Sequence, residues 1–243
     1  MLDLLLLSSL AILPSLLLIF LLYGLSYKAP PPVSLMLIAS LFGMISTYPA
    51  IKMEEFGIYD LGMLLQGDLW TSFTFSFLIV AFSEETLKYI FLRYYLYPKK
   101  EFAVPLDGIV YAGCIGLGFA AAENFLYLVI RLDDLDQAYS LAYRRMFTAL
   151  PAHAAFGIVM GYFMGLARFK AKKEVLFLLL ALLFPIILHG LYDFFIFQKL
   201  SKVLTIFTEI TLAISLLLGA FMIRAHRHYK RRTEKGPPPF IEL

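Results

Sequence analysis

The run LLLLSSLAILPSLLLIFLL, residues 4–22, decides the class of fold, because it is long and apolar enough to cross a lipid bilayer as one helix. Such a helix needs about 20 predominantly apolar residues. A secretory signal peptide carries positive charge ahead of its apolar segment. Here only Asp3 precedes the run, and the first cation, Lys28, follows it. We therefore interpret residues 4–22 as a span that stays in the membrane.

The composition of the whole chain supports the same class. Hydrophobic residues make up 60% of the 243 residues and charged residues only 16%, and the mean hydropathy is +0.78. Soluble domains are about 45–50% apolar and about 25% charged, so their surface could not accommodate this much Leu and Phe. A soluble enzyme, a nucleic-acid-binding module and a disordered scaffold are excluded. The single cysteine, Cys114, excludes a disulfide framework.

Seven apolar runs predict an all-α, polytopic bundle of about seven transmembrane helices. The runs cover residues 4–22, 33–50, 69–97, 106–130, 141–169, 175–197 and 203–223. Together they define one transmembrane domain, residues 1–223. A basic tail, residues 224–243, follows. We expect this tail to be disordered and to attach to anionic lipid rather than to nucleic acid.

The distribution of Lys and Arg between the two sets of loops predicts the orientation. One side carries thirteen cations: Lys28, Lys99, Lys100, Arg168, Lys170, Lys172, Lys173, Arg224, Arg227, Lys230, Arg231, Arg232 and Lys235. The other side carries six: Lys52, Arg131, Arg144, Arg145, Lys199 and Lys202. Cytoplasmic loops are the ones enriched in Lys and Arg. We therefore expect the N-terminus outside and the C-terminus in the cytoplasm.

Two outer loops are predicted between these spans. Residues 51–68 mix acidic with apolar residues, which is typical of a segment that lies in the membrane interface as a lid. Residues 131–137 hold Asp133, Asp134 and Asp136. A cation site there is possible in principle, but we expect a solvated loop.

Ionisable and polar residues interrupt the middle spans, where a bilayer makes them costly and where they are usually functional. The third span carries an acidic pair and a lysine, the fourth a Glu-Asn pair, the fifth a histidine, and the sixth a histidine and an aspartate. These residues are Glu84, Glu85, Lys88, Glu123, Asn124, His153, His189 and Asp193.

The depth of these residues points to one site. With a rise of about 1.5 Å per residue, Glu85, Glu123, His153 and His189 lie about 18–24 Å from the cytoplasmic ends of their helices. All four thus fall at a similar level in the outer half of a hydrocarbon core of about 30 Å. Independent structural residues have no reason to agree in depth, so we predict that the four converge.

Local spacing adds detail. Lys88 lies four residues after Glu84 and three after Glu85, so it can face either carboxylate; a pair that only neutralises the helix for insertion is an equally good interpretation. Asp193 lies one turn after His189, where it can orient the imidazole or share a metal with it.

Small residues in the fourth and fifth spans predict that helix backbones approach closely there. They are Gly113, Gly116, Gly118, Gly157, Gly161 and Gly165.

The polar residues resemble the PrsW family in order and spacing. The matching motifs are Glu84-Glu85-Thr-Leu-Lys88, Phe119-Ala-Ala-Ala-Glu123-Asn124, His153 and His189-Gly-Leu-Tyr-Asp193. They cover the third to sixth spans, about half of the chain. The wider superfamily of CAAX prenyl endopeptidases and bacteriocin-processing proteases is similar. Glu123 stands where the prenyl endopeptidases have His, which favours the PrsW family.

The resemblance implies a function. It implies an intramembrane endopeptidase of the prokaryotic cell membrane, with its catalytic core at about residues 69–197. Such an enzyme would cleave a membrane protein near its extracytoplasmic face. The substrate class implied by the family is a single-span protein such as an anti-sigma factor, whose first cut starts a regulated cascade.

Two mechanisms are open for such a peptidase. In one, Glu85 or Glu84 is the general base for a water held by His153 or His189, while Asn124 and the second histidine stabilise the oxyanion. In the other, His153, His189 and Glu123 hold a zinc ion with an open position. We favour the mechanism without an obligatory metal.

Two other classes of function fit the buried charges. A proton-coupled transporter would also use buried Glu, His and Asp, but transporters usually have duplicated halves, and the sequence has none. A non-catalytic relative that only binds membrane substrates is opposed by the intact acidic pair and both histidines. The Gly-x-Ser-x-Gly and His-Glu-x-x-His motifs of serine and zinc hydrolases are absent.

Overall fold

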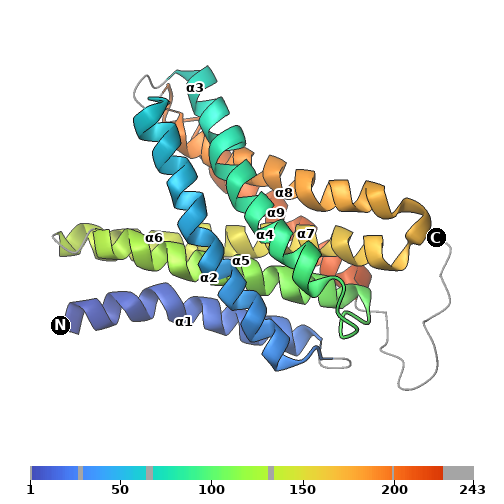
Figure 1. The fold of residues 1–243 in the computed structure, drawn as a ribbon. Helices are drawn as coiled ribbons and strands as arrows, with labels where there is room; N and C mark the ends of the chain where they lie inside the picture. Colours follow the sequence, from blue (N-terminus) through green and yellow to red (C-terminus); the bar gives the residue numbers. More distant parts are fainter. Residues whose placement is uncertain (1, 27–29, 64–67, 131–133, 199, 227–243) are drawn as a thin grey trace.

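The computed structural model describes residues 2–26, 30–63, 68–130, 134–198 and 200–226, and all regular structure in these ranges is helical (Figure 1). The α-helices are α1 Leu2–Leu25, α2 Val33–Glu55, α3 Leu69–Thr74, α4 Phe82–Phe91, α5 Pro105–Ile130, α6 Leu135–Phe147, α7 Ala149–Phe169, α8 Glu174–Phe197 and α9 Ile206–His226. Three π-helical segments, η1 Phe56–Asp60, η2 Phe75–Ala81 and η3 Leu92–Leu96, and the short 3₁₀-helix η4, Ala171–Lys173, complete the set.

Within the described ranges, six helical stretches are long and apolar enough to cross a membrane, and the chain is a multi-pass integral membrane protein. They are Asp3–Leu25, Val33–Asp60, Pro105–Leu128, Leu135–Phe169, Glu174–Phe197 and Ile206–His226. The remaining predicted span, residues 69–97, is helical from α3 to η3 but is not among the six. Its apolar character is interrupted by Glu84, Glu85, Lys88 and Arg93. The predicted all-α membrane bundle is confirmed, while its orientation stays a prediction.

The first outer loop is shorter than predicted, because α2 continues past residue 50 and runs into η1. Lys52 and Glu55 are good helix formers, and their side chains form an ion pair at 2.5 Å. The chain leaves the helical conformation near Gly62, which has a φ of 62°. Of the expected interfacial lid, the part up to Asp60 is therefore helical, and residues 64–67 lie outside the described residues.

The second outer loop is also different from the prediction. Asp134 caps α6, since its carboxylate accepts a hydrogen bond from the Gln137 N–H at 3.1 Å, so the expected solvated loop is wrong from Asp134 onward. Residues 131–133 lie outside the described residues. The fifth predicted span is two helices, α6 and α7, that meet at Thr148. Pro151, in the first turn of α7, has no N–H to continue the hydrogen bonds of α6.

The last helix, α9, begins three residues later than predicted and continues to His226. Arg224, which we had placed in the tail, therefore belongs to the helix. The rest of the predicted tail, residues 227–243, lies outside the described residues.

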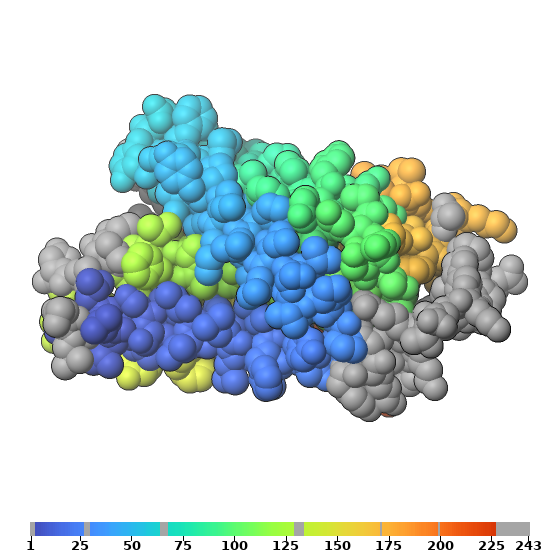
Figure 2. All heavy atoms as spheres, turned by 60° about the horizontal axis from the view of Figure 1, so that its bottom comes forward, coloured from blue at the N-terminus to red at the C-terminus, as the bar shows by residue number. Residues whose placement is uncertain are grey.

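The interior of the bundle is the contact between α5 and α7. A Cβ on Gly116 would lie 2.4 Å from the His153 carbonyl oxygen, and one on Gly161 would lie 2.2 Å from that of Gly108. Only glycine allows the two backbones to approach this closely, as the small-residue pattern predicted. The contact also fixes the backbone of His153 against α5. On the face shown in Figure 2, α1 and α2 (blue) lie in front, and the helices of the third span (green) lie beside α2.

At the C-terminal end of α7, the guanidinium group of Arg168 connects this helix to the segment that precedes α5. Arg168, in the last turn of α7, donates hydrogen bonds to the carbonyl oxygens of Phe102 at 2.8 Å and Lys99 at 3.0 Å, and to that of Tyr97. The Tyr97 hydroxyl donates in turn to Glu174 at the start of α8, at 2.9 Å. This Arg168 clamp holds the end of the third span against α7 and α8, and thereby sets how α4 faces them.

Candidate active site

The acidic pair lies on a short α-helical segment between two π-helical ones. α4 carries Glu84, Glu85 and Lys88, with η2 before it and η3 after it. π-helical turns are rare in proteins, and those that occur are often found at functional sites. Because neighbouring residues of a helix point about 100° apart, the two carboxylates can face different partners.

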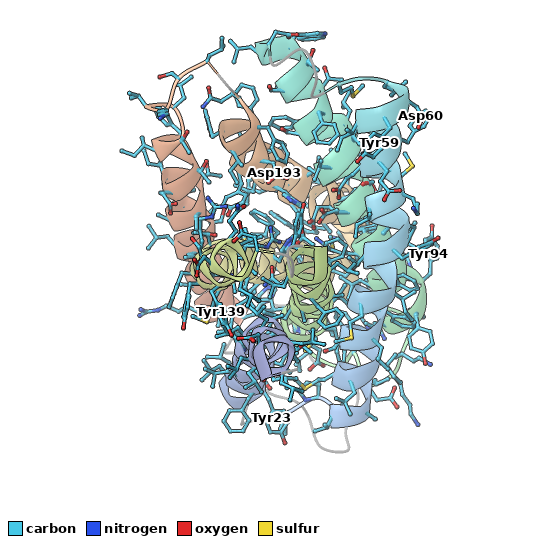
Figure 3. The ribbon with its side chains drawn as sticks, turned by 90° about the vertical axis from the view of Figure 1, so that its left-hand side faces the viewer. Tyr23, Tyr59, Asp60, Tyr94, Tyr139 and Asp193 are labelled. Carbon is cyan, nitrogen blue, oxygen red and sulfur yellow. The ribbon has the colours of Figure 1, made fainter. Side chains whose placement is uncertain are left out.

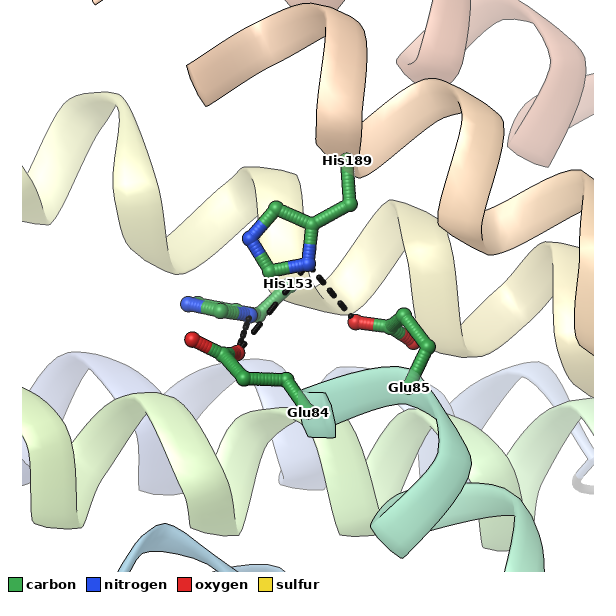
Figure 4. A group of neighbouring side chains, drawn as sticks. All are labelled: Glu84, Glu85, His153 and His189. Carbon is green, nitrogen blue, oxygen red and sulfur yellow. Dashed lines mark hydrogen bonds and ion pairs between the residues drawn. The ribbon is translucent and has the colours of Figure 1, made fainter. Parts of the chain in front are cut away.

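Four predicted residues meet in one buried group, which we call the Glu/His group: Glu84, Glu85, His153 and His189. Each offers one nitrogen or oxygen atom, and these atoms all lie within 4.8 Å of one another. Figure 4 shows α4 presenting both carboxylates to the imidazoles of α7 and α8. Glu85 is 0% exposed. The three helices thus bring together residues that are up to 105 positions apart, from Glu84 to His189.

Both histidines turn the same ring nitrogen toward the group. His189 Nδ1 lies 2.9 Å from Glu85 Oε1 and 4.0 Å from Glu84 Oε2. His153 Nδ1 lies 3.9 Å from Glu84 Oε2. The two rings are 5.3 Å apart between centroids and nearly perpendicular, at 88°.

A carboxylate holds the far nitrogen of each ring. His153 Nε2 lies 2.9 Å from Glu123 Oε2, and His189 Nε2 lies 3.1 Å from Asp193 Oδ2. A carboxylate in this position favours a proton on Nε2, and in that tautomer the Nδ1 electron pair faces the group and can bind a cation. The sequence predicted the Asp193 contact from its i,i+4 spacing, whereas the Glu123 contact joins α5 to α7.

Lys88 lies against the group. Its Nζ is 2.7 Å from Glu85 Oε1, 3.1 Å from Glu84 Oε2 and 3.2 Å from His153 Nδ1. It also lies 4.0 Å from the centre of the Phe119 ring, a cation–π contact. The two carboxylates are therefore not left as uncompensated buried charges.

Glu123 and Asn124 are bound to a residue that the sequence did not single out. Arg145 Nη2 lies 2.7 Å from Glu123 Oε2, and its Nε donates to Asn124 Oδ1 at 2.6 Å. The guanidinium group also lies over the Tyr127 ring at 4.4 Å. Asn124 thus supports Arg145 on α6, while Glu123 joins Arg145 to His153.

The Glu/His group has the chemistry of a metal site. Two imidazoles and two carboxylates are donors that suit zinc. Glu85 Oε2 is buried without a hydrogen-bond partner, and the contact of His189 Nδ1 with Glu85 Oε1 is favourable only with a proton or a cation between the two atoms. A cation would satisfy both. The set that fits is Glu84, Glu85, His153 and His189; Glu123, which we had placed in the zinc set, lies on the other side of His153.

A cavity of about 360 Å³ leads to the group. Glu84, His153 and His189 line it, and Glu85 does not. The rest of its wall includes Glu54 of α2, Glu123 and Tyr127 of α5, Arg144 and Arg145 of α6, Asp193 of α8, and Thr208 and Glu209 of α9. In Figure 3, Asp193 lies among the helices in the interior, whereas Tyr59 and Asp60 of η1 lie at the periphery.

Sequence reasoning did not single out several residues of this wall, among them Glu54 and Arg145. It placed Glu54 in the first outer loop and counted Arg145 among the outer cations. Glu54 lies three residues into the predicted outer loop and Arg145 four residues into the predicted fifth span, close to boundaries where no periodic pattern indicates which way a side chain faces. The only available signal was an acidic or basic residue next to a span that carries other charges.

Comparison with known proteins gives consistent results. The model of the PrsW family, described as intramembrane metalloproteases, matches residues 31–223. Protease PrsW of Geobacillus kaustophilus (strain HTA426) is 32% identical over 173 residues, which cover 71% of each chain. Protease PrsW of Bacillus subtilis (strain 168) is 42% identical over 124 residues, covering 51% of this chain and 54% of the relative. No solved structure matches the chain significantly.

Proposed function

The chain belongs to the PrsW family of intramembrane metalloproteases, and we propose that it cuts a single-span membrane protein, such as an anti-sigma factor, near the extracytoplasmic face. Its membership makes it a membrane-embedded peptidase, and its bacterial relatives place it in a prokaryotic membrane. The family membership supports this function over the proton-coupled transporter and the non-catalytic binding protein.

The observation that carries the proposal is the buried Glu/His group at the base of the cavity. Each histidine is held by a carboxylate on its far nitrogen, so both rings are oriented before a substrate arrives. Peptide hydrolysis needs an activated water, stabilisation of the oxyanion and a proton for the leaving amine. Oriented imidazoles and carboxylates supply these needs within one cavity.

The description of the family as metalloproteases supports the metal-dependent mechanism over the metal-free one that the sequence led us to favour. Glu85, His153 and His189 would hold the metal, and Glu84, the fourth member of the group, would lie beside it. When bound, the metal would act as a Lewis acid on the scissile carbonyl. A carboxylate of the acidic pair would take the proton of the attacking water.

Glu84 is the better candidate for this base. It lines the cavity, where a substrate and a water can reach it, whereas Glu85 is fully buried between Lys88 and His189. We therefore assign proton transfer to Glu84 and a holding role to Glu85, which reverses the order of preference within the pair. Arg145 lines the cavity as well and is better placed than Asn124 to contact the substrate backbone.

The test uses the purified protein in detergent with a panel of single-span substrates that includes anti-sigma factors. Mass spectrometry of the fragments identifies the cleaved bond. We expect cleavage by the wild type, loss of cleavage with a chelator, and recovery with Zn²⁺. His153→Ala is the matched inactive control. Equal cleavage by wild type and control would show that another protein in the preparation is the protease and would contradict the proposal.

A further inference from the structure

Lys88 is an enclosed ammonium group, and its hydrogen bonds and ring contact among the described residues are with members of the Glu/His group and with Phe119. Its side chain is 2% exposed. An ammonium has three donors, and the three hydrogen-bonding partners of Lys88 are Glu85, Glu84 and His153, at 2.7, 3.1 and 3.2 Å. Every donor is therefore used, and Phe119 covers the remaining side.

These partners are three of the four members of the Glu/His group. A metal ion and the ammonium would therefore draw on electron pairs of the same side chains. Without any cation, two neighbouring buried carboxylates would repel each other, because burial leaves their charges almost unscreened. The group thus needs a positive charge in order to stay assembled, and Lys88 supplies one from the same helix.

We propose that Lys88 is a built-in counter-cation that keeps the Glu/His group assembled without metal, so that metal binding is a competition with its ammonium. The metal-binding role of the group rests on the proposed function. Lys88 is here a positioning residue: it acts by holding Glu84, Glu85 and His153 in place until the metal replaces it.

The geometry favours this role over simple neutralisation of the third span. A lysine that only neutralises the helix for insertion would need to meet a carboxylate of its own helix. Lys88 also contacts His153, which lies 65 residues away on α7. The contact exists only in the assembled bundle, so it belongs to the folded site and not to insertion.

The main test compares the wild type with Lys88→Met and with the charge-keeping control Lys88→Arg, all freed of metal in detergent. Zn²⁺ affinity is measured by competition with a coloured chelator. We expect Lys88→Met to bind Zn²⁺ at least about tenfold more tightly, and Lys88→Arg to stay near the wild type. Weaker binding by Lys88→Met would show that Lys88 supports the metal instead of competing with it, which would overturn the proposal.

Thermal unfolding of the same proteins gives an independent result. We expect metal-free Lys88→Met to have a Tm lower than that of the wild type by on the order of 10 °C, because its buried carboxylates have lost their cation. Saturating Zn²⁺ should restore most of this loss and should change the wild type much less. A purely structural role would lower Tm without metal-dependent recovery. Equal responses of both proteins to Zn²⁺ would contradict the proposal.

A measurement on the wild type alone covers the case in which Lys88→Met does not accumulate. Reductive methylation of the detergent-purified protein, read by mass spectrometry, reports how available the Lys88 amine is. We expect the yield at Lys88 to rise several-fold when Zn²⁺ binds. An unchanged yield with stoichiometric Zn²⁺, or no Zn²⁺ binding, would overturn the proposal. None of these readouts uses a substrate, so a failure to cleave would refute only the proposed function.

Discussion

The two histidines of the site are held by equivalent contacts that are built in different ways. We call each histidine, together with the residues that hold its Nε2, an arm of the site. His189 and its carboxylate partner Asp193 lie one turn apart on α8, so one helix supplies the whole His189 arm. His153 depends on three helices: Glu123 comes from α5, and Arg145 of α6 binds Glu123 in turn. The first arm is a local property of the chain, whereas the second exists only when α5, α6 and α7 are assembled. A substitution in the second arm can therefore change the packing of α5, α6 and α7, whereas one in the first arm acts within a single helix.

The largest effect should come from removing the histidines, and it tests whether the two arms form one site. We expect His153→Ala and His189→Ala each to lower kcat/KM about 10³-fold or more, and the double variant to be little worse, because groups that act as a unit lose function together. Cleavage assays on the three variants provide the measurement. Multiplying losses in the double variant would mean that the arms work independently.

The acidic pair joins the arms and should show the next largest effect. We expect Glu84→Gln to lower kcat about 10²–10⁴-fold, the range for loss of a general base, with the Tm nearly unchanged. Glu85→Gln should act mainly by loosening Lys88 and His189, so that its Tm and Zn²⁺ affinity fall as well. If Glu85→Gln lost only kcat and Glu84→Gln lost metal affinity, the two roles would have to be exchanged.

The carboxylates that contact Nε2 of each histidine, Glu123 and Asp193, test the difference between the two arms directly. Glu123→Gln and Asp193→Asn should each weaken Zn²⁺ binding about 10- to 100-fold, since both remove the group that orients a ligand. Only Glu123→Gln also removes the ion-pair partner of the partly buried Arg145 guanidinium, so it should lower the free energy of unfolding by about a further 1–3 kcal/mol. Thermal melts beside metal titrations separate the two effects. Equal losses of stability would show that the arms are built more alike than their contacts indicate.

The smallest effect is the coupling between Glu123 and Arg145. A double-mutant cycle with Glu123→Gln and Arg145→Met should give an interaction free energy of about 0.5–3 kcal/mol. The matched cycle with Asp193→Asn and Arg145→Met should give a clearly smaller value, because no direct ion pair joins Asp193 to Arg145 among the described residues. Chemical or thermal unfolding in detergent measures both. Coupling of similar size in both cycles would remove the distinction between the arms.

The part of the site that could be predicted from the sequence follows the same division. The i,i+4 relation of His189 to Asp193 and the approach of Lys88 to both glutamates follow from the geometry of one helix, and their contacts are as predicted. The sequence predicted that Glu123 lies at the depth of the site. It did not predict which side of His153 Glu123 occupies, because depth in the membrane does not determine this. Arg145 was not found at all, since its contact depends on how α6 meets α5.

The fold shows a similar limit. The apolar runs predicted the spans well wherever a run was uninterrupted. They failed at residues 51–60 and 135–140, where the helices continue through polar sequence that hydropathy does not mark as helical. Capping by Asp134 and the i,i+3 pair of Lys52 and Glu55 are the local contacts that continue the helices there. The break at Thr148 needed the position of Pro151 within a turn, which an apolar run alone does not give.

The Arg168 clamp has a consequence for how the chain is made. The carbonyl groups that it binds are synthesised long before it, since Arg168 follows Phe102 by 66 residues. Until α7 has emerged from the ribosome, the least apolar span of the protein, from Leu69 to Leu96, has neither the clamp nor His153 to hold it. Stable insertion of this span therefore has to wait until the later helices have been synthesised and can pack against it. Truncation of the nascent chain before and after Arg168 would time that step, with the third span becoming resistant to extraction only in the longer chain.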